Sequence, residues 1–185
     1  NDSLMANHYN RFATIPFPRD SVNMYNKKAY YYANKIGSKE LLAITTNEMG
    51  MALRYKGVDT AYYYLNKALK LWRELGKKHA ELNTLVNLSG LYYHSADYKK
   101  SISYTDTIRQ VLSNLDFKYI RKMFYAYRYL SYKELNQYDS ALYYLDSLRL
   151  HEIHALKQEQ MVKIESLEEK SELRKKNIIL KQQED

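Results

Sequence analysis

The residues best suited to metal or acid–base chemistry are two histidines, His151 and His154, which lie three positions apart in a stretch with helical character. Imidazoles at that spacing share one face of a helix and can hold one metal ion. A metal site needs further ligands, and the sequence has no cysteine and no identifiable third ligand nearby. Phosphate-binding glycine loops, serine elbows and paired-carboxylate motifs are not recognisable either. We therefore predict no metal, no cofactor and no catalytic residues, and we expect that the protein is not an enzyme.

A second group of residues is suited to holding another chain. Asn7, Asn47 and Asn87 recur at intervals of 40 residues, and Tyr127 occupies the next position of the same column. An amide donates and accepts hydrogen bonds at once, so a row of amides can hold the backbone of an extended peptide whatever its sequence. Asparagine is a middling helix former, so its recurrence asks for an explanation. The plainer alternative is that these polar residues face solvent and share a register by coincidence.

Neighbouring columns supply further candidate ligand-binding residues. Arg54, His94 and Lys133 have side chains that can receive a carboxylate or an acidic side chain. The complete set of predicted ligand-binding residues is Asn47, Asn83, Asn87, Arg54, Tyr93, His94, Tyr127 and Lys133.

An internal repeat of 40 residues must position these side chains. One column holds small residues, and a column three positions later is rich in tyrosine: Ser21, Ala61, Ser101, Ala141 and Met24, Tyr64, Tyr104, Tyr144. Spacings of three and four residues within each unit mark one face of a helix. An earlier column contains Phe12, Ala52, Tyr92 and Tyr132. Turn residues separate the two columns in each unit: Pro16–Pro18, Lys56–Asp59, Ser95–Asp97 and Asn136–Gln137. Each unit is thus a helix, a turn and a longer helix, with boundaries near residues 19, 57, 97 and 138.

These residues resemble the tetratricopeptide repeat. Its pattern places an aromatic residue after a leucine in the first helix and small residues in the second, and Leu88, Tyr92 and Ser101 fit it, as do Tyr132 and Ala141. The resemblance covers four units, from about residue 4 to residue 150. It departs from the usual period of about 34 residues, because these units are longer. The resemblance implies an all-α, right-handed α-solenoid whose first helices line a concave groove that binds a protein or peptide.

Charge leaves a second function open. Residues 1–151 hold 22 Lys and Arg against 13 Asp and Glu, whereas residues 152–185 hold 7 against 8. A basic array can bind nucleic acid, and we keep a nucleic-acid-binding helical-repeat protein as the alternative function. The basic residues are scattered, however, which favours an ordinary solvated surface over a nucleic-acid patch.

The last part of the chain, residues 151–185, is predicted as a charged helix that follows the repeat array of residues 1–150. Residues 139–185 contain no glycine or proline, and an apolar stripe follows an 11-residue period: Ile153, Leu156, Ile164, Leu167 and Ile178. Such a stripe can pair two helices, so a homodimer through this helix is one expectation, and a solvated or frayed tail is the other.

Repeats running into a charged helix resemble the sensory region of regulators from the Bacteroidetes. That resemblance implies a periplasmic part of a membrane-anchored regulator, with a cytoplasmic location as the alternative. No stretch of the sequence approaches the roughly 18 apolar residues of a membrane span. Membrane attachment is therefore expected only through a segment outside the printed sequence.

Overall fold

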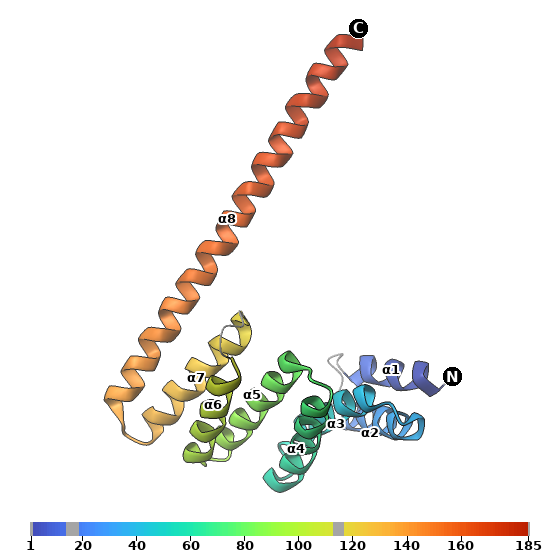
Figure 1. The fold of residues 1–185 in the computed structure, drawn as a ribbon, viewed down its shortest axis with the longest axis vertical. Coiled ribbons are helices and arrows are strands. Elements are labelled where there is room, and N and C mark those ends of the chain that lie inside the picture. Colours follow the sequence, from blue (N-terminus) through green and yellow to red (C-terminus); the bar gives the residue numbers. More distant parts are fainter. Residues whose placement is uncertain (1, 14–18, 113–116, 185) are drawn as a thin grey trace.

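The computed structural model describes residues 2–13, 19–112 and 117–184, and the side chains of these residues except 11–13, 19–23 and 178–184. Every element in the described residues is an α-helix, as the scarcity of glycine and proline predicts. The eight helices form four successive pairs: α1 (Asp2–Ala13) with α2 (Arg19–Ile36), α3 (Lys39–Leu53) with α4 (Val58–Glu74), α5 (Lys78–His94) with α6 (Tyr98–Leu112), and α7 (Lys118–Glu134) with α8 (Tyr138–Glu184). The pairs stack side by side along the array (Figure 1). The predicted all-α solenoid of four helix pairs is confirmed.

The predicted boundaries within the units are also confirmed. The second helices begin at Arg19, Val58, Tyr98 and Tyr138. The turn expected at Pro16–Pro18 and the side chains of Phe12 and Ser21 lie outside the described residues.

The turns inside the third and fourth units share one hydrogen-bond pattern, which also occurs after α4, where the Lys77 amide donates to the Trp72 carbonyl. The Asp97 amide donates to the Tyr92 carbonyl, and the Gln137 amide donates to the Tyr132 carbonyl, both at 2.9 Å. This six-to-one bond ends a helix when the preceding residue is left-handed. Ala96 and Asn136 supply that residue, with φ of 62° and 58°. Asparagine tolerates this conformation, whereas alanine adopts it at a cost.

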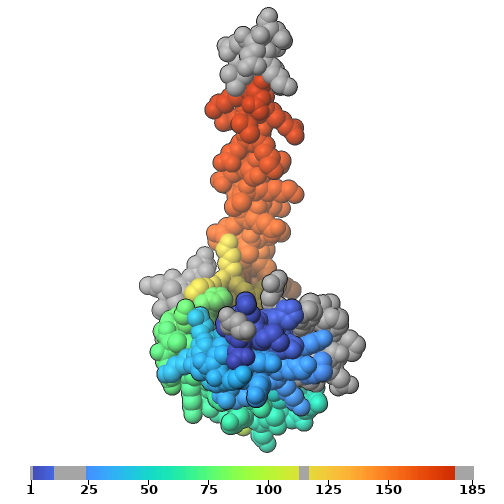
Figure 2. All heavy atoms as spheres, turned by 90° about the vertical axis from the view of Figure 1, so that its right-hand side faces the viewer, coloured from blue at the N-terminus to red at the C-terminus, as the bar shows by residue number. Residues whose placement is uncertain are grey.

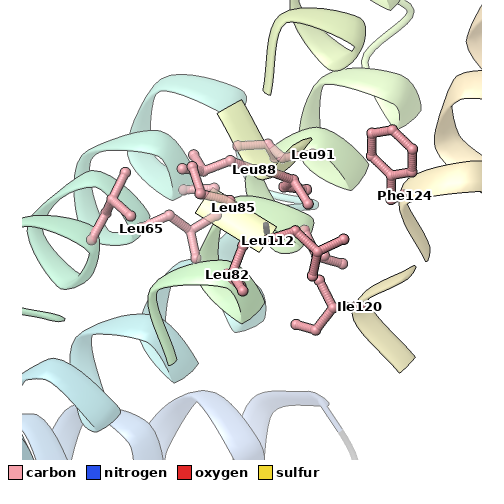
Figure 3. Packing of buried hydrophobic residues seen from close by; sticks show 12 residues of the cluster. Leu65, Leu82, Leu85, Leu88, Leu91, Leu112, Ile120 and Phe124 are labelled. Carbon is pink, nitrogen blue, oxygen red and sulfur yellow. The ribbon is translucent and has the colours of Figure 1, made fainter. Parts of the chain in front are cut away.

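The core is built where small residues let two helices approach. Ala61, Ser101 and Ala141, the predicted small-residue column, are all buried. Gly50 serves the same purpose on α3, because a Cβ there would lie 2.6 Å from Cγ of the buried Leu65. The largest apolar cluster runs through α4 to α7 and includes the leucines, Ile120 and Phe124 drawn in Figure 3. The repeat columns therefore predict packing, as expected for stripes at helical spacing.

The fourth unit differs from the others on the side where a further unit would stack. Trp72 and Leu112 are buried in the second and third units, but Glu152 takes the corresponding position on α8 and is exposed. Its carboxylate pairs with Lys122 on α7 at 2.8 Å. A polar outer surface is what the terminal unit of a stacked array requires.

Helix α8 continues far beyond the array. Its 47 residues span about 70 Å at 1.5 Å per residue, and its distal part projects away from the repeat body (Figures 1 and 2). Ile153, Leu156, Ile164 and Leu167 are each more than half exposed. The side chain of Ile178 lies outside the described residues. The proposed division at residue 150 falls inside this unbroken helix.

None of the helices in the described part of the chain has the length and hydrophobicity that crossing a bilayer requires. Helix α8 is long enough, but charged residues recur throughout it.

Candidate functional site

The first helices of successive units lie next to one another. Helix α1 contacts α3, and α5 contacts α7, while a side-chain hydrogen bond described below joins α3 to α5. We call the surface formed by α1, α3, α5 and α7 the first-helix face. It carries the column of amides that the sequence singles out.

Two of these amides bond directly to each other across units. The Asn87 Nδ2 on α5 donates to Asn47 Oδ1 on α3 at 3.1 Å. The Thr84 hydroxyl approaches the same oxygen at 3.2 Å. Asn47 and Asn87 are half-buried. Asn7, in contrast, is exposed on α1.

A carboxyl group extends this row of hydrogen bonds. Asn47 Nδ2 donates to Glu48 Oε1 at 3.2 Å. Burial raises the pKa of Glu48, and the hydrogen bond from Asn47 lowers it by less, so this pKa lies above its ordinary value. The Asn47 amide is thereby bonded on both sides, to Glu48 on α3 and to Asn87 on α5.

Two adjoining hollows lie beside these amides, and we refer to them together as the Arg54 cleft. Their volumes are about 480 Å³ and 140 Å³, and both are lined by Arg54, Tyr55, Leu91 and His94. The larger hollow continues along the α3–α4 turn to Lys56 and Val58 and reaches Ser95. The smaller one reaches Asn87, Gly90 and Tyr127. Ligand pockets in proteins commonly have volumes of about 300–1,000 Å³.

Gly90 and Tyr127 form the floor of the smaller hollow. A Cβ added at Gly90 would overlap the Tyr127 hydroxyl, so the glycine is what allows this ring to lie against α5. Burial, the largest cause, raises the pKa of Tyr127. The phenol is therefore neutral near pH 7 and can donate a hydrogen bond.

The predicted ligand-binding residues divide into two groups. Arg54, Asn87, His94 and Tyr127 come together in the Arg54 cleft, and Asn47 adjoins it through its bond to Asn87. Three others do not line it. Asn83 is half-buried on α5, Lys133 is exposed in the last turn of α7, and Tyr93 packs its ring against Tyr98 and Tyr127.

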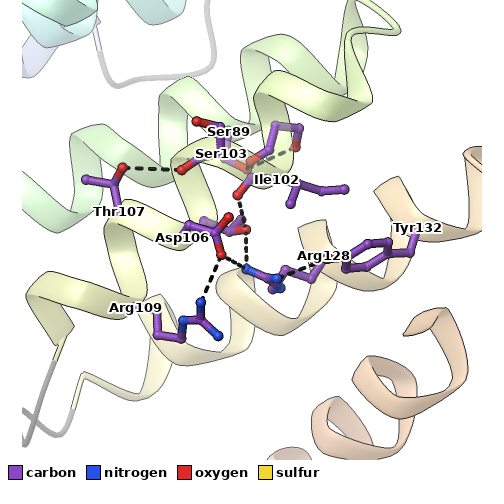
Figure 4. Close-up of polar contacts among 10 residues, drawn as sticks. Ser89, Ile102, Ser103, Asp106, Thr107, Arg109, Arg128 and Tyr132 are labelled. Atoms are coloured by element: carbon purple, nitrogen blue, oxygen red, sulfur yellow. Dashed lines mark hydrogen bonds and ion pairs between the residues drawn. The ribbon is translucent and has the colours of Figure 1, made fainter. Parts of the chain in front are cut away.

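Sequence reasoning missed a buried arginine, Arg128 on α7. Its guanidinium donates to Asp106 Oδ1 at 2.6 Å and to the Tyr132 hydroxyl at 3.1 Å (Figure 4). Glu48, Leu88 and Arg128 occupy one column of the repeat. The change from leucine to a charged residue at a core position was the available signal. Because Arg128 is enclosed between α6, α7 and α8, it fixes the third unit to the fourth and does not face a ligand.

Of the two histidines considered for metal binding, His151 is bonded to and packed against other parts of the protein. His151 Nε2 donates to the Lys118 carbonyl at 2.9 Å, and its ring packs against Tyr125. No group of three or more potential metal ligands gathers among the residues that the structure describes.

Comparison with known proteins agrees with the geometry of the repeats. The tetratricopeptide repeat family matches residues 41–106. The repeats of this family generally mediate protein–protein interaction, and its members are generally non-enzymatic. A search of curated proteins finds no match to the sequence.

A solved structure has the same arrangement of helices. BtubC (BKLC) from P. vanneervenii superimposes with a TM-score of 0.75, covering 84% of this chain and 66% of that protein, at 16% sequence identity. The chain thus spans slightly less than two thirds of the length of BtubC, and at this identity the likeness concerns the fold. Residues 41–106 thus match the tetratricopeptide repeat family, and the helices on either side of them extend the same α-solenoid.

Proposed function

We propose that this protein is a non-enzymatic scaffold that binds a protein or peptide on the first-helix face, and that it is the interaction region of a larger signalling or transcriptional regulator. The observation that carries the proposal is the contact between Asn47 and Asn87 beside the Arg54 cleft. It joins backbone-binding groups from two successive units at the edge of a hollow.

The proposed ligand is an extended peptide segment. The bonds described above use one N–H of each amide, and an amide nitrogen carries two. The remaining donors lie on successive units, so they can meet successive backbone carbonyls. This form of recognition depends little on the peptide's side chains, which instead enter the cleft.

A peptide library displayed on phage tests this function with the full 185-residue chain. We expect selected peptides to lose binding in Asn87→Ala and to keep it in Asn34→Ala, which removes an exposed amide from α2. Thermal unfolding followed by circular dichroism checks that both variants are folded. Peptides that bind Asn87→Ala undiminished would reject the first-helix face. Binding of nucleic acid that falls steeply with salt would favour the alternative function.

The signalling part of the proposal rests on α8. Its exposed stripe of Ile153, Leu156, Ile164 and Leu167 is suited to pairing two protomers. The resemblance to sensory regions of Bacteroidetes regulators supports a membrane-anchored, periplasmic setting, in which pairing would pass ligand occupancy to an output module.

Dimerisation can be measured by sedimentation at micromolar concentrations. We expect a dimer of the full chain that Ile164→Asn combined with Leu167→Asn dissociates, while Glu168→Gln leaves it intact. If the full chain is a monomer at all concentrations, the α8 stripe does not pair two protomers. If a dimer persists in the double variant, its interface lies on another part of the protein.

A further inference from the structure

Arg54 differs in its surroundings from three other arginines, the exposed Arg73 and Arg109 and the buried Arg128. Arg73, Arg109 and Arg128 each pair with a carboxylate, at 2.9, 3.3 and 2.6 Å. Arg54 takes part in no ion pair within the described part of the chain, although it is half-buried. A partly desolvated guanidinium without a counter-charge is costly unless something supplies one.

The Arg54 guanidinium is also held in a fixed position. Its Nη1 donates to the Met51 carbonyl at 3.0 Å, and its Nη2 donates to the Tyr55 hydroxyl at 3.0 Å. The Tyr55 ring lies 4.5 Å below it. A guanidinium has five N–H donors, so these two bonds fix its direction and leave donors for another acceptor.

The charged side chains that line the Arg54 cleft are positive. Lys56 and His94 line the cleft with Arg54, and neither hollow has an aspartate or glutamate among its described lining residues. Leu91 and Val58 form apolar walls. The combination suits a group that carries negative charge at its tip and a hydrocarbon chain behind it.

We propose that the Arg54 cleft binds a carboxylate of the partner peptide, with Arg54 as its direct ion-pair partner and the Tyr127 hydroxyl as a second donor. This inference rests on the proposed peptide-binding function and names the chemistry of its ligand. Guanidinium and carboxylate fit as a two-pronged, charge-assisted pair. The carboxylate enters beside Asn87, so the amides hold the peptide backbone while the cleft holds the acidic group. An internal Asp or Glu and a peptide C-terminus present the same chemistry.

Three capped peptides separate these sources. Acetyl-Ala-Ala-Glu-Ala-Ala-amide carries an internal carboxylate, acetyl-Ala-Ala-Gln-Ala-Ala with a free C-terminus carries a terminal one, and acetyl-Ala-Ala-Gln-Ala-Ala-amide carries none. NMR titration of the full chain measures their affinities from the signals of residues 87–94. We expect one carboxylate peptide or both to bind at least about tenfold more tightly than the neutral peptide, as a charged hydrogen bond implies.

Matched variants tie the preference to the cleft. Arg54→Gln should abolish the preference for a carboxylate, while Arg149→Gln makes the same charge change on exposed α8 and should leave it intact. Gly90→Ala displaces Tyr127 without changing charge and should weaken the same peptide about threefold to tenfold.

Equal binding of all three peptides would overturn the carboxylate inference while leaving the peptide-binding function in place. A preference that persists in Arg54→Gln, or binding of none of the three when library-selected neutral peptides do bind, would overturn it as well. Failure of library selection and of all three peptides together would instead reject the peptide-binding function.

Discussion

Asp106→Asn is expected to destabilise the protein more than Arg128→Leu, although both substitutions remove the same ion pair. The Arg128 side chain is 5% exposed and that of Asp106 is 41% exposed. Without the carboxylate, a buried positive charge keeps only neutral partners, the hydroxyls of Thr105 and Tyr132 and nearby aromatic rings. Without the guanidinium, Asp106 remains accessible to water and lies 3.3 Å from Arg109.

The structure gives the size of this asymmetry. Leaving one member of a buried ion pair without its partner costs about 3–5 kcal/mol. The Tyr144 ring lies 4.7 Å from the Arg128 guanidinium, and cation–π attraction of about 1–2 kcal/mol offsets part of that cost. We therefore expect a loss of about 1–4 kcal/mol for Asp106→Asn. Arg128→Leu should cost about 1 kcal/mol or less, because it loses hydrogen bonds but places an apolar side chain where the preceding unit has the fully buried Leu88.

The charge state of Arg128 supports this reasoning. Burial lowers the pKa of Arg128, but the hydrogen bond to Asp106 and the neighbouring tyrosines outweigh burial and hold the pKa above its usual value. The guanidinium is therefore charged at every pH at which the protein is studied. In Asp106→Asn it stays charged, because it does not become neutral by releasing a proton.

Urea unfolding followed by circular dichroism measures the two free energies of unfolding. Arg109→Leu serves as the control, because this exposed residue contacts the same carboxylate and should change stability by about 0.5 kcal/mol or less. The reasoning is refuted if Arg128→Leu costs as much as Asp106→Asn, since the burial of the guanidinium would then not decide the energy.

Three further expectations concern stability. Gly50→Ala should cost about 1–2 kcal/mol by calorimetry, because the new Cβ meets the buried Leu65 at 2.6 Å, and unchanged stability would show that α3 and α4 are less closely packed. Ala96→Gly should stabilise by about 0.5–1 kcal/mol, since φ is 62° there, and a loss would contradict the left-handed turn. Burial raises the pKa of Glu81, but hydrogen bonds from Arg73 and Lys78 outweigh it and hold the pKa below its ordinary value. Its stabilisation is therefore complete above the pKa of the unfolded chain and is lost as pH falls through the folded value. Glu81→Gln should make the free energy of unfolding depend less on pH in the acid range. An unchanged pH profile would show that other groups cause the acid dependence.

The arrangement of helices followed from local chemistry that the sequence records directly. Small residues recur at Ala61, Ser101 and Ala141 because two helix backbones must approach there, and this requirement repeats in each unit. Turn residues mark the breaks in the same register, so the helix boundaries could be placed without knowledge of the tertiary structure. Continuation of α8 followed in the same way from the absence of glycine and proline after residue 138.

Part of the candidate site followed from the same periodicity. The columns placed Asn47 and Asn87 on successive first helices, and the structure brings them within 3.1 Å. Periodicity predicts which residues share a face. It does not predict which hydrogen-bonding groups of these side chains bond to neighbouring residues and which remain for a ligand. The bond from Asn47 to Glu48 is an example, because it depends on rotamers that only the surrounding packing selects.

Tertiary structure alone decided which charged residues have partners. In the sequence Arg54, Arg128 and Lys133 are equivalent cations, but in the fold Arg128 meets Asp106, Lys133 is exposed, and Arg54 lines a cleft without an ion-pair partner among the described residues. These differences arise because ion pairs join helices of adjacent units, at distances that depend on how the units stack. A stacked array of helix pairs with a polar row on its first helices could be predicted from the sequence, since both depend on repeated local patterns. Packing between units decided where that row opens into a basic cleft, because burial and charge pairing depend on residues distant in the chain.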